Sequence, residues 1–353
     1  MENLVSRVWD LNNTFVGEFF MSEPIKINFC DMSSRLFDYD DNFILDIIKK
    51  RFGEYEISDK PDFLFYSAFG TDHLRFDDCV KVFITDEAVT PEFNECDYAM
   101  GFDWITFEDR YIRRPVWFGE ERFYNNRMSI TDEEALSRKF CNFVYFNDFS
   151  GRGSIFRQEF VKKLSEYKRV DCPGKVLNNM KSDKLSYHYD GDWRKSKIDF
   201  VHDYKFTIAF ENSSFVGYTT EKILHPIIAR SVPIYWGNPV VGRDYNTNAF
   251  IDCTGYEDNI EQIIEKILEL DTNDDLYLKM LKEEPMSERF NTNESKDLEE
   301  FFVNIINKGN NPYNKDPRNW AKRMSVDHMS RREKIRYFLC KEKRTGESIH
   351  AKK

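Results

Sequence analysis

A polar loop that runs into the start of a predicted helix could bind a nucleoside diphosphate. The loop covers Glu211–Tyr218, and either Thr219 or Thr220 could cap the helix that follows. The first turn of a helix offers free backbone N–H groups and a partial positive charge, which favour a pyrophosphate. Lys222 would add a full positive charge there, and Glu221 could accept hydrogen bonds from ribose hydroxyls.

A second interpretation of the same residues needs no ligand. A glutamate such as Glu221 is favourable in the first helical turn because of the helix dipole, whether or not anything binds there. Lys222 could be a solvated surface residue. Spacing alone leaves both interpretations open.

The elements around this loop indicate an α/β protein. Short and nearly continuous apolar runs alternate with stretches of helical periodicity, which is typical of parallel strands covered on both faces. We expect strands at Lys26–Cys30, Asp62–Tyr66, Val80–Ile84, Tyr98–Phe102, Cys141–Phe146, Val170–Pro173, Tyr204–Phe210, Val232–Trp236 and Ala249–Asp252, and helices at Phe43–Phe52, Gly153–Tyr167, Thr220–Arg230 and Glu257–Leu270.

Two such units follow one another, and a chain of 353 residues is too long for one ordinary core. Asn125–Arg138 is polar and charged, so we interpret it as part of a linker. We therefore expect an N-terminal domain over residues 1–135, a C-terminal domain over 136–310 and a basic helical tail over 311–353. In such sheets, ligands bind where strands end and helices begin.

Composition excludes some classes of protein. The net charge is −11 and the basic residues gather in the tail, which does not suit a nucleic-acid binder. Met1–Phe20 lacks the pattern of a secretory signal, and no apolar run is long enough to predict a spanning helix. The seven cysteines are scattered without a CxxC pair, so we expect reduced, mostly buried thiols in a cytoplasmic protein.

The stretch from Tyr204 to Asp252 resembles the donor-binding signature of the α-1,3/4-fucosyltransferase family. Several short motifs in order and at matching spacing are far more specific than a lone glycine motif. They are FENS at Phe210–Ser213, GY at Gly217–Tyr218, TEKI at Thr220–Ile223, and PIYWG at Pro233–Gly237 followed by Pro239.

This resemblance implies a fold and a reaction. The fold would be of the GT-B type, with two facing Rossmann-like domains and a cleft between them. The reaction would be an inverting transfer of L-fucose from GDP-β-L-fucose to a GlcNAc-containing acceptor such as N-acetyllactosamine, giving an α-1,3 linkage of the Lewis x type. Two alternatives remain, namely a transferase of the same fold that uses another nucleotide sugar, and a non-catalytic glycan- or nucleotide-binding protein.

The resemblance also implies roles for five residues of the second domain. Glu221 matches the ribose-binding carboxylate and Lys222 the pyrophosphate-binding lysine. Asn212 and Tyr218 match positions that touch the donor nucleotide. Arg157 matches an arginine that reaches the phosphates; its alternative is a surface residue of the helix Gly153–Tyr167.

In the first domain, FITDEAVTPEFNECDY at Phe83–Tyr98 resembles the family segment that carries the proposed general base. Glu87 falls on the family glutamate. The chain departs from the usual Gly-Glu-Asn at this point, because Asp86 and Ala88 flank Glu87. Asp86 is therefore the rival for the base, and both carboxylates could also simply end a strand.

The resemblance implies no metal and no other cofactor, with cations stabilising the leaving diphosphate. Asp190–Gly191–Asp192 has the spacing of a metal-binding Asp-x-Asp pair, but we interpret it as a loop acid pair. The basic tail around Arg318–Arg344 has two interpretations, an amphipathic helix at the inner face of a bacterial membrane or a helix that packs on the first domain. Similarity to bacterial members predicts a cytoplasmic location.

Overall fold

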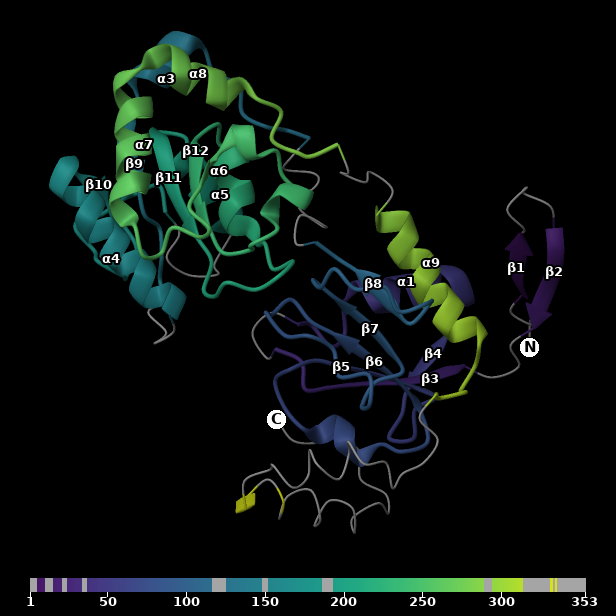
Figure 1. Ribbon diagram of the computed structural model, residues 1–353. Coiled ribbons are helices and arrows are strands. Elements are labelled where there is room, and N and C mark those ends of the chain that lie inside the picture. Colours follow the sequence, from purple (N-terminus) through teal and green to yellow (C-terminus); the bar gives the residue numbers. More distant parts are fainter. Residues whose placement is uncertain are drawn as a thin grey trace. The chain divides into compact units, whose positions relative to one another are not determined.

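The computed structural model divides into two compact α/β units (Figure 1). It describes residues 24–33, 37–115, 125–147, 152–185, 193–288 and 294–313, the backbone of 5–9 and 15–20, and residues 331, 332 and 334. The first unit comprises Met1–Gly101, Ile105–Arg114 and the chain from Asn293 onward. The second comprises Phe102–Trp104 and Pro115–Thr292.

The first unit is built on a six-stranded sheet in which all neighbouring strands are parallel, in the order β4-β3-β5-β6-β7-β8. The two central strands, β5 and β6, are buried along their whole length, as expected for strands covered on both faces. The strands are β3 (Ile25–Cys30), β4 (Tyr55–Ile57), β5 (Phe63–Tyr66), β6 (Val80–Ile84), β7 (Tyr98–Gly101) and β8 (Tyr111–Arg113). A separate antiparallel hairpin joins β1 (Val5–Trp9) to β2 (Phe15–Phe20).

Helix α1 (Phe43–Phe52) and the much later helix α9 (Glu294–Asn307) lie side by side on this unit (Figure 1). The Phe302 ring of α9 packs against the rings of Phe43 and Phe65, at centroid distances of 5.7 and 6.1 Å. Glu299 accepts hydrogen bonds from Lys50 and Arg51 of α1. A short 3₁₀ turn, η1 (Asp72–Arg75), follows β5.

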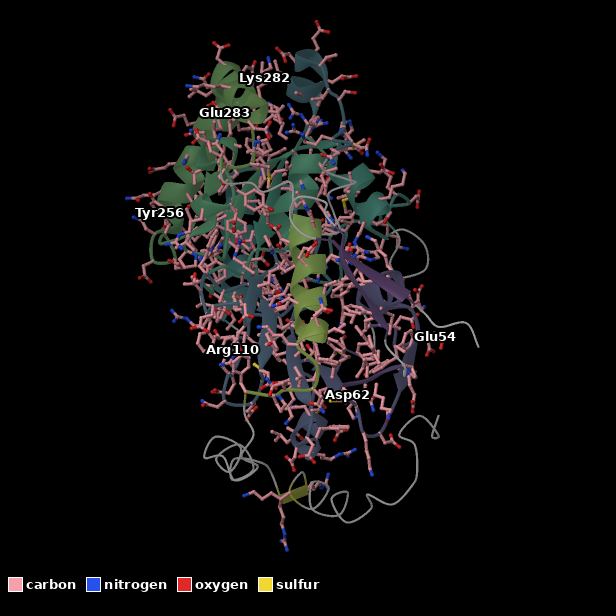
Figure 2. The ribbon with its side chains drawn as sticks, turned by 90° about the vertical axis from the view of Figure 1, so that its right-hand side faces the viewer. Glu54, Asp62, Arg110, Tyr256, Lys282 and Glu283 are labelled. Carbon is pink, nitrogen blue, oxygen red and sulfur yellow. The ribbon has the colours of Figure 1, made fainter. Side chains whose placement is uncertain are left out.

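Residues 308–313, directly beyond α9, run along the amino ends of strands of the first sheet. Asn310 donates to the Asp62 side chain just before β5, and the backbone N–H of Tyr313 donates to Asp97 just before β7. The guanidinium of Arg110 lies over the Tyr313 ring at 4.4 Å. Asp62 and Arg110 are labelled in Figure 2.

The second unit holds a five-stranded sheet, again entirely parallel, in the order β10-β9-β11-β12-β13. Its strands are β9 (Lys139–Asn142), β10 (Val170–Asp171), β11 (Tyr204–Phe210), β12 (Val232–Trp236) and β13 (Ile251–Asp252). Its helices are α3 (Asp132–Ser137), α4 (Arg152–Tyr167), α5 (Trp193–Val201), α6 (Glu221–Ile228), α7 (Ile260–Thr272) and α8 (Asp274–Lys282), with 3₁₀ turns η2 (Val241–Arg243) and η3 (Thr247–Ala249).

Helices cover both faces of this sheet. Phe206, Ile208 and Phe210 of β11 share one apolar core with residues of α4, α7 and α8. Ala209 of the same strand belongs to a second core that α5 and α6 complete. Because side chains alternate along a strand, one strand supplies both cores, which is the doubly wound arrangement that the sequence predicts.

The division of the chain differs from the predicted one in two places. The predicted linker Asn125–Arg138 contains helix α3, whose Thr131 and Glu134 form a capping box, and it belongs to the second unit. Helix α9 falls within the predicted second domain but packs on the first unit. The strand predicted at Cys141–Phe146 lies earlier, at Lys139–Asn142.

Three predictions about the whole chain stand as follows. The described residues include six of the seven cysteines, all unpaired and five of them buried. Among the described helices, none combines the length and apolar character needed to cross a bilayer. Most of the basic tail lies outside the described residues, so its membrane contact and the cytoplasmic location stay predictions.

Candidate functional site

The candidate site of the second unit lies between the carboxyl end of β11 and the start of α6. The Thr220 side chain accepts a hydrogen bond from the backbone N–H of Lys222, so of the two caps that the sequence allows, Thr219 and Thr220, it is Thr220 that caps the helix. Gly217 adopts a φ of 86°, and a Cβ there would lie 2.3 Å from the carbonyl oxygen of Phe102. Only glycine fits this bend of the loop.

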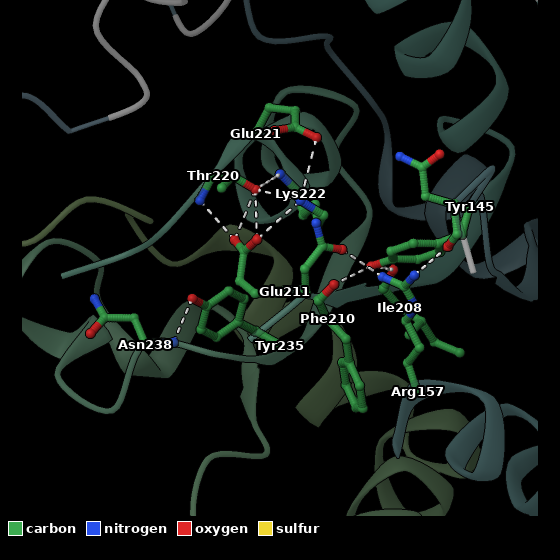
Figure 3. A network of polar contacts seen from close by, with 12 residues as sticks. Tyr145, Arg157, Ile208, Phe210, Glu211, Thr220, Glu221, Lys222, Tyr235 and Asn238 are labelled. Carbon is green, nitrogen blue, oxygen red and sulfur yellow. Dashed lines mark hydrogen bonds and ion pairs between the residues drawn. The ribbon is translucent and has the colours of Figure 1, made fainter. Parts of the chain in front are cut away.

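The Lys222 ammonium lies inside a polar network that centres on Glu211 (Figure 3). It donates to the Glu211 carboxylate at 3.1 Å and to the Thr220 hydroxyl at 3.0 Å. The Glu221 carboxylate is 3.8 Å away on the outer side, with 26% of its side chain exposed against 0% for Glu211. The lysine thus lies between one buried and one accessible carboxylate.

The protonation states follow from this geometry. Burial disfavours the charged form of Lys222, but Glu211 and Glu221 together hold the pKa of its amine well above the usual range. Burial would also raise the pKa of Glu221, yet the neighbouring ammonium outweighs burial and lowers it to about 2. Burial raises the pKa of Glu211 despite the opposing charge of Lys222. At neutral pH, Lys222 carries its proton and Glu221 is ionised.

Arg157, on α4, contacts the same loop at Asn212. Its guanidinium donates to the Asn212 amide oxygen at 2.9 Å and to the Asn147 carbonyl, and it lies over the Tyr145 ring at 4.4 Å. The side chain is only 1% exposed. The Tyr145 hydroxyl donates to the Phe210 carbonyl at 2.8 Å, next to Glu211 in sequence. Arg157, Glu221 and Lys222 therefore gather around the loop that begins at Glu211 (Figure 3).

Two further predicted donor residues differ in exposure. Asn212 is exposed, so its side chain is accessible beside Arg157. Tyr218 is 4% exposed, and its ring makes an edge contact with Phe102 at 5.0 Å. Tyr218 thus packs within the loop, and its contact with a nucleotide stays a prediction.

In the first unit, Glu87 and Asp86 follow the carboxyl end of β6, and both are exposed. Asp86 pairs with Arg114 at 3.2 Å. The backbone N–H of Glu87 donates to the Thr85 hydroxyl at 3.0 Å, which fixes the turn that presents the glutamate. Both candidates for the base are thus at the edge of the sheet where parallel α/β units bind ligands.

No group of three or more His, Cys, Asp or Glu side chains suited to a metal occurs in the part of the chain that the structure describes. Asp190 and Asp192 lie outside that part. The need for a metal therefore stays untested.

The sequence analysis missed Glu211 as a functional residue. The signal was a carboxylate directly after a mostly apolar strand, at the point where a doubly wound sheet binds ligands. It also missed Asn238, a fully buried amide that accepts from Gly217 N–H at 2.9 Å and donates to Thr219 at 2.9 Å. Asn238 thus clamps the loop ahead of α6.

Comparison with known proteins now identifies the family. Residues 27–119 match the model of the α-(1,3)-fucosyltransferase FucT N-terminal domain. Residues 147–305 match the C-terminal model of glycosyltransferase family 10, the fucosyltransferases. The chain belongs to the family 10 fucosyltransferases. The first match includes Glu87, and the second includes the loop around Lys222.

Among curated family 10 relatives, the α-(1,3)-fucosyltransferase FucT of Helicobacter pylori is 30% identical over 250 residues, which cover 61% of this chain and 49% of that protein. A putative fucosyltransferase of Acanthamoeba polyphaga mimivirus is 28% identical over 208 residues, covering 58% of this chain and 34% of that protein. The aligned region thus spans half or less of these relatives.

Solved family structures match over a larger share. A crystal structure of an α1,3-fucosyltransferase superposes with a TM-score of 0.64 at 26% identity, covering 81% of this chain and 90% of that one. A crystal structure of an α1,3-fucosyltransferase with GDP-fucose gives a TM-score of 0.61 at 26% identity, covering 82% of this chain and 93% of that one. The two-unit parallel α/β fold of a family 10 fucosyltransferase, predicted from the sequence, is confirmed.

Proposed function

We propose that the protein is an inverting α-1,3-fucosyltransferase that moves L-fucose from GDP-β-L-fucose to a GlcNAc-containing acceptor such as N-acetyllactosamine. One observation carries this proposal above all: Arg157, Glu221 and Lys222 gather around one loop, at the carboxyl end of β11, in a family 10 chain. The relatives that share this fold are named α1,3-fucosyltransferases, and one was solved with GDP-fucose.

In this proposal the second unit binds the donor. The α6 N-terminus and Lys222 bind the diphosphate, and Glu221, ionised because of its low pKa, accepts hydrogen bonds from the ribose hydroxyls. Arg157 contacts the phosphates, and Asn212, to which it is hydrogen-bonded, contacts the donor nucleotide. Negative charge grows on the diphosphate as the glycosidic bond breaks, and preorganised cations stabilise that charge more in the transition state than in the ground state. These cations take the role that a metal has in other transferases.

The first unit supplies the general base. The acceptor hydroxyl is a weak nucleophile at neutral pH, so a carboxylate must take its proton while it attacks the anomeric carbon on the face opposite GDP. We propose Glu87 for this role rather than Asp86, because Glu87 is the residue that falls on the family glutamate. A general base contributes about 10²–10⁴ in rate.

The test combines binding and turnover. Calorimetric titration with GDP, UDP and ADP should show tight binding to GDP alone, and incubation with GDP-fucose and N-acetyllactosamine should give a fucosylated product by mass spectrometry. Tight binding to UDP alone would mean another nucleotide sugar. GDP binding without product over an acceptor screen would mean a non-catalytic protein. NMR of the product determines the linkage.

A further inference from the structure

Glu211 is a completely buried carboxylate to which the proposed reaction gives no role. Its backbone N–H donates to the Trp236 carbonyl at 2.8 Å, which fixes the residue beside β12. Its side chain is 0% exposed. One oxygen accepts from the backbone N–H of Thr220 at 2.7 Å, and the other accepts from the Lys222 ammonium at 3.1 Å. Burying a carboxylate is costly unless its partners compensate, so these contacts need an explanation.

The neighbouring strand leaves room for this carboxylate. Gly237, directly after β12, has a φ of 156°, and a Cβ there would lie 2.4 Å from Cγ of Glu211. Any side chain at position 237 would displace Glu211 from the network. The loop after β11 and the loop after β12 are thus shaped around one acidic group.

The hydrogen bonds of this network all fit one arrangement of protons. The Thr220 hydroxyl donates to the Glu211 carboxylate, from which it is 2.8 Å, and accepts from the Lys222 ammonium. An ammonium group has three N–H donors. Glu211 and Thr220 accept two of them from the inner side, so the third points away from Glu211, on the side where the accessible carboxylate of Glu221 lies.

We propose that Glu211 is a positioning residue, an internal counter-charge that holds the Lys222 ammonium at the start of α6 ready to bind the diphosphate of the donor. This inference rests on the proposed function for the identity of the ligand only. Glu211 fixes two things at once, the helix cap Thr220 and the ammonium, so that the N–H groups of α6 and the lysine face the same anion. It acts through Lys222 and does not itself contact the donor.

Glu211→Gln separates these two tasks. The amide oxygen of glutamine can still accept from the Thr220 N–H, whereas its NH₂ group cannot accept from the Lys222 ammonium. The variant should therefore keep the helix cap and release the lysine. A matched control is Glu257→Gln. Glu257 is a carboxylate of the same unit that accepts a hydrogen bond from the Trp236 indole N–H at 2.6 Å, and it makes none of the contacts with Lys222 described above.

The first experiment needs no nucleotide. Competitive acetylation of the intact protein with acetic anhydride over a pH series, followed by mass spectrometry of the peptide that contains Lys222, measures how well that amine is protonated and held. The titratable groups acting on it are Glu211, Glu221, Tyr218 and Tyr145. Lys222 in Glu211→Gln should be acetylated about tenfold faster than in the parent at pH 8, and the Glu257→Gln control should match the parent. Equal rates in the parent and Glu211→Gln would overturn the proposal.

The second experiment is a double-mutant cycle on GDP affinity, with Glu211→Gln, Lys222→Met and the two combined. Glu211→Gln alone should weaken GDP binding about tenfold. In the Lys222→Met background it should cause no further loss, because a residue that acts through Lys222 has nothing left to position. Additive losses would contradict the inference.

The outcomes keep the two proposals apart. A parent protein that does not bind GDP, but whose Lys222 becomes reactive in Glu211→Gln, refutes the donor assignment and leaves the positioning role standing. If Glu211→Gln does not fold, the combined variant decides by thermal unfolding against Lys222→Met. Lys222→Met leaves the buried carboxylate of Glu211 without its counter-charge, and the second change neutralises that carboxylate. The combined variant should therefore unfold at a higher temperature than Lys222→Met. An equal or lower unfolding temperature would overturn the role of Glu211.

Discussion

The Arg157 guanidinium donates to the amide oxygen of Asn212 at 2.9 Å, so a helix of the second unit and the loop after β11 are joined directly at the candidate site. A lysine keeps the charge but cannot reproduce this planar fork, which also reaches the Asn147 carbonyl. We expect Arg157→Lys to weaken GDP binding by about tenfold, or roughly 1.4 kcal/mol, by calorimetry. Arg169→Lys, at an exposed pair with Asp171, should leave GDP binding unchanged.

Removing the Lys222 ammonium should strongly lower turnover. Lys222→Ala takes away a preorganised donor to the leaving diphosphate, and such donors are worth about 10²–10³ in kcat. We expect weaker GDP binding and a loss of that order in steady-state transfer. Lys282→Ala, which breaks an exposed pair with Asp132, is the control and should transfer normally. Normal kinetics in Lys222→Ala would remove this lysine from the site.

The first unit offers a test that separates binding from chemistry. Glu87→Gln should leave GDP affinity unchanged, since the base does not bind the nucleotide, and should lower kcat by about 10²–10⁴. Asp86→Asn removes the charge of the neighbouring side chain but keeps its size, and should lose little activity. If Asp86→Asn loses turnover and Glu87→Gln does not, Asp86 is the base.

Thr220 should matter for stability through its hydroxyl. That group caps α6, donates to buried Glu211 and accepts from Lys222. Thr220→Ala should lower the free energy of unfolding by about 2 kcal/mol, the range of a lost cap with buried partners, whereas Thr220→Ser should lose well under half as much. Urea unfolding of both variants measures the difference. Equal losses would assign the effect to the methyl group.

A buried histidine predicts how the stability of the first unit depends on pH. His73 Nδ1 lies 2.7 Å from Asp31, and Nε2 lies 3.4 Å from Glu95. Burial disfavours the imidazolium, but the two carboxylates raise the pKa of His73 above its usual value. Its stabilisation is therefore complete below the unfolded-state pKa of about 6.5 and is lost as pH rises through the folded-state pKa.

We expect the unfolding temperature of the parent protein to fall as pH rises above about 6.5, through the raised pKa of His73. In His73→Gln this slope should be smaller, because glutamine can bond the carboxylates but does not titrate. The carboxylate of Asp31 has a lowered pKa, so its own contribution is lost only at acid pH, outside this window. An unchanged slope in His73→Gln would exclude His73 as its source.

The sequence predicted well those elements whose apolar pattern is strong. The helix Phe43–Phe52 and the strands Val80–Ile84, Tyr204–Phe210 and Val232–Trp236 have the predicted bounds. Each is either nearly continuously apolar or has a clear helical period, so local pattern and tertiary burial agree. The cap at Thr220 was predicted for the same reason, since capping is a local preference.

The predictions that failed concern features that depend on contacts between residues distant in sequence. Helix α9 has an amphipathic pattern that fits either unit, and only the partners of Phe302 assign it to the first. The six-residue helix α3 carries the charged residues of a linker, although its capping box was a local signal that could have been used. The role of Glu211 depends on Gly237 and Lys222 from two other segments. No local pattern shows that these three meet.

The return of α9 to the first unit means that the polypeptide cannot be cut once to release two intact halves. A fragment ending near Arg114 would lack the helix that covers Phe43 and Phe65, and would leave those rings in water. A hybrid that exchanges the first unit between relatives must therefore transplant two separate stretches, the N-terminal one and the later one that contains α9 and Tyr313. Exchanging the N-terminal stretch alone would pack the sheet of one protein against the helix α9 of another.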